Sequence, residues 1–211
     1  EERQTQGLIL MTNKQQTNIL LPTNEDTTGP YFPTYFNDES YEDLTQIHSG
    51  VIAGPSGQHI ILRGRVLDRN GKLANGVLIE FWQANAKGIY RNPSSENHPD
   101  LDPWFDGYGR LRSTTGEYTY RTIFPGASKD RAPNITITIF SDGINRIVTQ
   151  IFFANQKANE IDPLLKTLSD QDRKRLTAKY AGPSPDGADV YKLDIIMAGD
   201  NETPFFDDFL S

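Results

Sequence analysis

Apolar and polar residues alternate along several short stretches of the chain after residue 58. These stretches are rich in β-branched and aromatic residues and end at Gly, Pro, Asn or Asp, which is typical of strands. The clearest alternation places Ile135, Ile137 and Ile139 on one face and threonines on the other. The pattern predicts at least six strands, at 59–68, 76–82, 117–123, 134–140, 146–153 and 190–197. We therefore expect an all-β fold, an antiparallel β-sandwich or barrel.

One short helix is predicted among these strands. Ser169 is a candidate N-cap, and Asp172 three positions later nearly completes a capping box. Leu168, Leu176 and Tyr180 then follow at spacings that suit one helix face. Residues 91–116 show neither the alternation of a strand nor the spacing of a helix face, and they are interpreted as a loop.

Residues 1–58 have no periodicity and are rich in Thr, Asn, Gln, Gly and Pro, with short aromatic clusters. Aromatic rings are uncommon in free tails, so this arm is expected to lie along another surface. A length of 211 residues suits one structural domain. The predicted organisation is an N-terminal arm at 1–58 that packs on a partner subunit, followed by a β-sandwich at 59–211.

The charge balance excludes two classes of partner. With 21 basic and 28 acidic residues the formal net charge is −7, and no basic stripe is available to neutralise nucleic-acid phosphates or an anionic membrane. No apolar run is long enough to span a bilayer. The chain has no cysteine, which excludes disulfides, thiolate nucleophiles and cysteine metal sites. A cytoplasmic location is the expectation.

The residues alone do not reveal an activity. The three histidines, His48, His59 and His98, lack the short spacing of a local metal-binding pair. The chain also lacks a nucleophile elbow, a P-loop and a dinucleotide-binding glycine fingerprint.

A series of segments in the second part of the chain resembles the intradiol ring-cleavage dioxygenases. The segments occur in the family's order, and they include 62–68, 77–85, 88–90, 101–103, 107–110, 122–126 and 149–150. The resemblance implies an antiparallel β-sandwich. It also implies a non-haem Fe(III), held by two tyrosinates and two histidines, that opens a catechol ring between its hydroxyls with O2. Hard phenolate oxygens suit ferric iron.

Most of the implied iron ligands are missing from this chain. Tyr90 matches the first tyrosine, but residues 127–129 contain no second one, and Asn134 and Thr136 occupy the histidine positions. Arg131 and Gln150 match residues of catalytic family members. The resemblance thus implies a vestigial site of Tyr90, Arg131, Asn134, Thr136 and Gln150. It implies that the chain binds no metal and has no catalytic residue when alone.

Within the family, the chain resembles the non-catalytic α subunits of the protocatechuate 3,4-dioxygenases. This implies an αβ heteromer in which a homologous catalytic β subunit binds Fe(III), a catechol-type substrate and O2. The segment at 27–31 and the carboxyl end at 201–207 carry the likeness. By this resemblance, this chain would add a pocket wall to the partner's site, made of Thr27, Gly29, Pro30, Tyr31 and Asp142. Asp142 stands where α subunits usually have arginine.

A second interpretation, from another class, stays open. The chain could be a stand-alone binding or structural protein with a decayed dioxygenase fold, in which Tyr90, Arg131 and Gln150 only pack and form hydrogen bonds. A homomeric enzyme with an unusual metal site is a third. The ring substituent of the substrate and the number of αβ pairs are not predicted.

Overall fold

The computed structural model describes residues 42–46, 54–141 and 145–206, all within one compact unit. These ranges contain nine strands, two short α-helices and short 3-10 turns. The strands are β1 (His59–Leu67), β2 (Val77–Gln83), β3 (Tyr108–Ser113), β4 (Glu117–Ile123), β5 (Asn134–Ser141), β6 (Asn145–Phe153), β7 (Thr177–Pro183), β8 (Asp189–Lys192) and β9 (Ile195–Ile196). The helices are α1 (Pro163–Lys166) and α2 (Asp170–Arg175).

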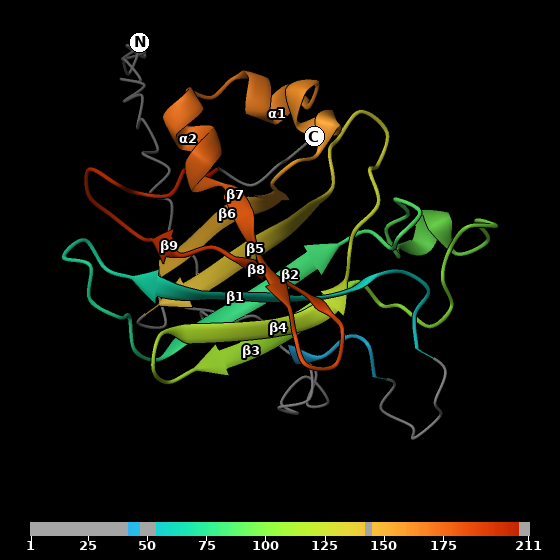
Figure 1. Cartoon of the computed structure of the whole chain (residues 1–211), viewed down its shortest axis with the longest axis horizontal. Coiled ribbons are helices and arrows are strands. Elements are labelled where there is room, and N and C mark those ends of the chain that lie inside the picture. Colours follow the sequence, from blue (N-terminus) through green and yellow to red (C-terminus); the bar gives the residue numbers. More distant parts are fainter. Residues whose placement is uncertain (1–41, 47–53, 142–144, 207–211) are drawn as a thin grey trace, which may run out of the picture. The chain divides into compact units, whose positions relative to one another are not determined.

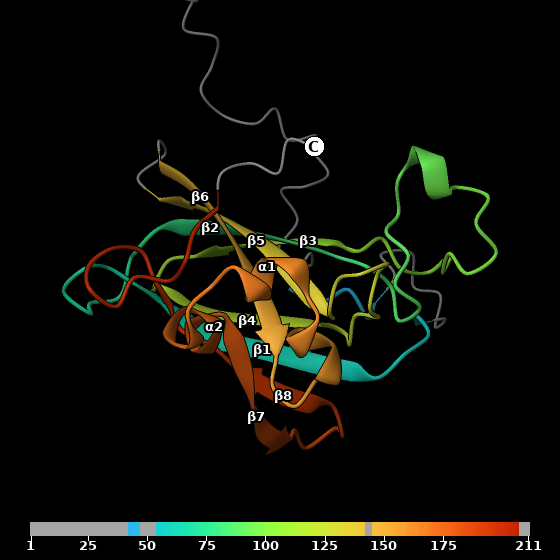
Figure 2. The same ribbon diagram turned by 90° about the horizontal axis from the view of Figure 1, so that it is seen from above.

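The strands form one sheet that folds over into two layers. Its order is β3-β2-β5-β6-β7-β8-β1-β4, with β9 beside β1, so the two edges β3 and β4 are consecutive strands and the sheet nearly closes. Figures 1 and 2 show β2, β3 and β5 in one layer and β1, β4 and β8 in the other. The predicted all-β sandwich is confirmed. The sheet is mixed rather than purely antiparallel, because β1 pairs in parallel with β8 and β9, and β6 with β7.

The core lies between the layers. The predicted alternation in β5 is confirmed, since Ile135, Ile137 and Ile139 are fully buried. Phe81 of β2 stacks on Tyr120 of β4 with ring centroids 4.0 Å apart, which joins the layers through aromatic contact. The burial of such apolar area is the main stabilising contribution to a sandwich.

Two segments differ from the sequence-based prediction. Residues 91–116, interpreted as a loop, contain β3, whose alternation is weak because Leu111 is its one aliphatic residue. The strand predicted at 190–197 is two strands, β8 and β9, separated at Leu193 and Asp194. The N-cap prediction is confirmed, since Ser169 Oγ accepts a hydrogen bond from the Asp172 N–H at 3.1 Å. The helix ends at Arg175, so Tyr180 lies in β7 rather than on a helix face.

The arm predicted at 1–58 falls mostly outside the described residues and stays a prediction. In the parts of the chain that are described, no helix is long and apolar enough to cross a membrane.

Candidate functional site

Three of the five predicted vestigial residues meet on the outer face of β5 and β6. Thr136 of β5 and Gln150 of β6 are directly paired, and Gln150 Nε2 donates to Thr136 Oγ1 at 3.2 Å. Arg131, from the loop before β5, donates from Nη2 to Gln150 Oε1 at 2.5 Å. The three side chains therefore form one hydrogen-bonded chain.

This hydrogen-bond network also includes the buried carboxylate of Asp162. Arg131 Nε donates to Asp162 Oδ2 at 2.9 Å, and the backbone N–H of Ala132 donates to the same oxygen at 2.9 Å. The other oxygen, Oδ1, caps α1 by accepting from the N–H groups of Leu164 and Leu165. Asp162 is fully buried, so its charge requires these partners. The sequence-based prediction missed this residue, although an aspartate before a proline at the first helical position is a usual helix start.

Asn134 lies beside this network on the same strand. Its side chain is 4% exposed and donates from Nδ2 to the carbonyl oxygen of Ala132 at 2.7 Å. No described residue donates a hydrogen bond to its Oδ1. The side chain at this predicted histidine position is thus a buried neutral amide that is bonded to the backbone of the loop before β5.

Two close backbone contacts position Tyr90. The Gly126 N–H donates to the Asn85 carbonyl at 2.9 Å, and a Cβ on Gly88 would lie 1.9 Å from the Ala127 carbonyl oxygen. At this φ of +80° and this short distance, only glycine fits at position 88. The turn before Tyr90 therefore lies directly against the loop that leads to Arg131.

The Tyr90 ring lies nearly parallel to that of Trp82, with centroids 6.3 Å apart. Burial raises the pKa of the Tyr90 phenol above its ordinary value, while the positive charge of Arg131 acts in the opposite direction. The structure therefore brings Tyr90 within electrostatic range of the network, and burial favours its neutral form.

The residues at this site do not fit Fe(III). The predicted ligand positions contain only one phenol, one amide and one hydroxyl, and the guanidinium of Arg131 adds a positive charge that opposes a cation. Ser128, where a second tyrosine is absent, pairs its backbone with Arg131. Across the described ranges, no cluster of three His, Asp or Glu side chains could hold a metal ion.

The predicted pocket-wall residues cannot be placed. Thr27, Gly29, Pro30, Tyr31 and Asp142 lie outside the described residues.

Comparison with known proteins gives a consistent set of relatives. Residues 27–199 match the family model described as Dioxygenase. The chain is 35% identical over 203 residues to the protocatechuate 3,4-dioxygenase alpha chain of Pseudomonas putida, and the alignment covers 89% of this chain and 98% of that one. It is 32% identical over 203 residues to the corresponding beta chain of Burkholderia cepacia, with 89% and 86% covered.

A solved structure supports the fold. The dioxygenase domain of a carbohydrate-binding fusion protein from Streptomyces sp. SirexAA-E superposes with a TM-score of 0.58 at 24% identity, over 81% of this chain and 94% of that one.

Proposed function

Because the chain belongs to the intradiol ring-cleavage dioxygenase family, we propose that it is a non-catalytic α-type subunit of a heteromeric enzyme similar to protocatechuate 3,4-dioxygenase. Enzymes of this family use non-haem iron. In the proposed complex a homologous β chain holds Fe(III), and a catechol-type ring is opened there between its two hydroxyls with O2. The present chain contributes scaffold and part of the pocket.

The observation that carries the proposal is the state of the predicted ligand positions. Thr136 accepts a hydrogen bond from Gln150, and the buried Asn134 side chain donates to the Ala132 carbonyl. Arg131 is held in the same place by the buried carboxylate of Asp162. A site in which threonine, glutamine and arginine bond to one another, and which contains a fixed cation, is suited to stabilising the fold rather than to binding iron.

The relatives support a two-chain assembly. Curated proteins that resemble this chain include both alpha and beta chains of protocatechuate 3,4-dioxygenases, at 32–35% identity. The identities are too similar to assign the chain type, so the assignment rests on the ligand positions.

The wall of the shared pocket is part of the proposal. We assign it to Thr27, Gly29, Pro30, Tyr31 and Asp142, on the resemblance alone. An acid at position 142 would repel a substrate carboxylate, so Asp142→Arg should raise the preference for a carboxylated catechol over catechol by roughly tenfold. The ratio of the two kcat/KM values measures this in the assembled enzyme. An unchanged ratio would show that Asp142 does not face the substrate.

Co-expression with an intact paralogue that has both tyrosines and both histidines tests the whole proposal. The two chains should co-purify as a complex with iron and ring-opening activity. The present chain purified alone should have neither stoichiometric iron nor the colour of a tyrosinate–Fe(III) complex. The paralogue purified alone is the control for iron content and activity.

Two results would contradict the proposal. Stoichiometric iron in the isolated chain would indicate a metal site of another kind. A chain that folds without iron and does not associate with the paralogue would favour the stand-alone binding or structural protein.

A further inference from the structure

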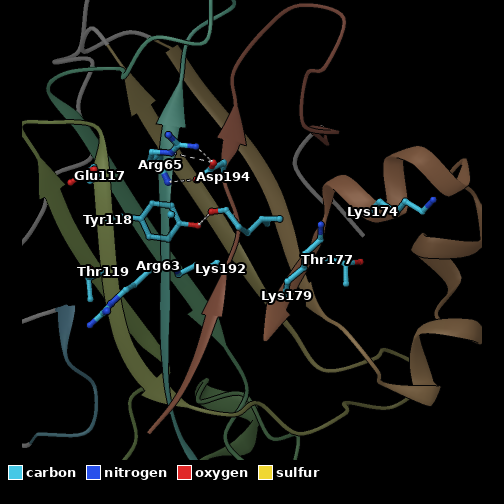
Figure 3. Close-up of a pocket in the computed structure, with 12 residues that line it drawn as sticks. Arg63, Arg65, Glu117, Tyr118, Thr119, Lys174, Thr177, Lys179, Lys192 and Asp194 are labelled. Atoms are coloured by element: carbon cyan, nitrogen blue, oxygen red, sulfur yellow. Dashed lines mark hydrogen bonds and ion pairs between the residues drawn. The ribbon is translucent and has the colours of Figure 1, made fainter. Parts of the chain in front are cut away.

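A groove of about 580 Å³ is lined by residues of β1, β4, β7 and β8, and it concentrates positive charge. Five cations line it, although the chain as a whole has a net charge of −7. They are Arg63, Arg65, Lys174, Lys179 and Lys192, and Figure 3 shows their side chains around the groove.

Three of these cations form a row across adjacent strands. Arg63 of β1 is paired with Lys192 of β8, and Lys192 is paired with Lys179 of β7. Residues that are paired in this way project from the same face of a sheet, and neighbouring strands are about 4.8 Å apart. The row thus places the backbones of three cationic residues within roughly 10 Å, and like charges on paired residues destabilise a sheet when nothing neutralises them.

Acidic groups in the groove neutralise a different cation. Arg65 donates to Asp194 from Nη2 at 2.5 Å and from Nε at 3.2 Å, and the negative charges of Asp194 and Glu117 raise the pKa of Arg65. Among the described residues, Arg63, Lys179 and Lys192 have no ion pair. The side chains of all three are exposed. Lys174, which also lines the groove, is exposed and has no ion pair among the described residues either, so the unneutralised charge comprises the row and this lysine.

The backbone at one end of the row makes the hollow. A Cβ on Gly64 would lie 1.7 Å from the Leu193 carbonyl oxygen, so glycine allows the chain after β8 to pack closely against β1 there. The buried Tyr118 hydroxyl donates to that same carbonyl at 2.7 Å. This close contact lies where β8 ends, and Asp194, the next residue, pairs with Arg65 and adds an acidic residue at that end of the groove.

We propose that the row of Arg63, Lys192 and Lys179 binds a compact multivalent anion, of the polycarboxylate or polyphosphate class. Neighbouring cations stand on strands about 4.8 Å apart and have long, flexible side chains, so two or more charged groups of a compact anion can each bridge neighbouring cations. Asp194 and Glu117 at one end would repel an extended acidic peptide or nucleic acid that continued along β1. This inference is independent of the proposed dioxygenase function.

The test compares citrate and pyrophosphate with sodium chloride at the same ionic strength. Thermal unfolding and titration calorimetry are applied to the full chain and to Lys192→Gln, which removes the central cation. Lys166→Gln, an exposed lysine on α1, is the matched control. Citrate, pyrophosphate or both should raise the melting temperature of the wild type beyond the chloride effect. Lys192→Gln should weaken the binding by about tenfold, and the control should not change it.

The variant has a second signature that a merely structural lysine would not give. Without a multivalent anion, Lys192→Gln should melt at the same temperature as the wild type or above it, because it relieves repulsion in the row. With the anion the order should reverse. Equal responses of wild type and Lys192→Gln would overturn the proposal, as would no effect beyond chloride. Binding by the isolated chain that disappears in the assembled complex would also overturn it, since the groove would then be a subunit contact.

Discussion

Replacing Arg131 with methionine tests whether the vestigial site stabilises the fold. Methionine keeps an unbranched apolar stem but removes the guanidinium, and with it the hydrogen bonds to Asp162 and Gln150. The carboxylate of Asp162, which is fully buried, then has no counter-charge. The domain should unfold more easily for that reason.

The size of the effect follows from the contacts. Removing one partner of a buried ion pair costs about 3–5 kcal/mol. Two features lower this figure, because the Arg131 side chain is 27% exposed and Asp162 keeps three backbone N–H donors. We expect the free energy of unfolding to fall by about 2–3 kcal/mol.

Urea unfolding followed by circular dichroism measures this change. Arg112→Met, at an exposed arginine on β3 without an ion pair among the described residues, is the control and should cost less than about 0.5 kcal/mol. A double-mutant cycle with Asp162→Asn should show a coupling energy of about 1–2 kcal/mol. The reasoning is refuted if Arg131→Met costs no more than the control, or if the two changes are simply additive.

Three further predictions concern the backbone, the core and the arm. Gly88→Ala should cost more than about 3 kcal/mol, because its Cβ would lie 1.9 Å from the Ala127 carbonyl. The control is Gly71→Ala, at a similar φ of +73° but with no atom near its Cβ, and it should cost about 1 kcal/mol. Equal melting temperatures of the two variants would contradict this reasoning. Burial raises the pKa of the Tyr120 phenol in the folded protein above its unfolded value of about 10. The neutral phenol therefore contributes fully to the free energy of unfolding below about pH 10, and this contribution is lost as the pH rises toward the raised folded pKa. Tyr120→Phe should make the alkaline fall in stability shallower, and an unchanged slope would count against it. Deleting residues 1–31 should lower turnover of the assembled complex more than it lowers the melting temperature, and unchanged kinetics would argue against a pocket role for the arm.

Local patterns predicted the strands that have a clear period. The isoleucines of β5 alternate because one face is buried, and that requirement is visible in the sequence itself. β3 was not predicted, because Leu111 is the one large aliphatic side chain on its buried face. The break between β8 and β9 was also missed, since it depends on the contact of Leu193 with Gly64, which lies far away in the sequence.

The candidate site was likewise predictable from the sequence only in part. The absence of histidine after His98 is a property of the sequence, and the prediction that two histidine ligands are missing follows from it together with the resemblance. The partner that anchors Arg131 could not be predicted, because Asp162 reaches it only through the packing of α1 against the end of the sheet.

By itself, the sequence determined the all-β class and the alternating core, because these depend on residue identity and on neighbours within a few positions. The prediction that iron ligands are missing also came from the sequence, through its resemblance to the family. Tertiary structure decided which strands pair in parallel, how the vestigial residues bond to one another, and that Arg63, Lys192 and Lys179 stand in one row. Pairing register is chosen by the burial of whole faces across the domain, and a shift of one residue would turn every side chain of a strand to the other face. Such a choice is made by the assembled sheet and is not encoded in any short segment.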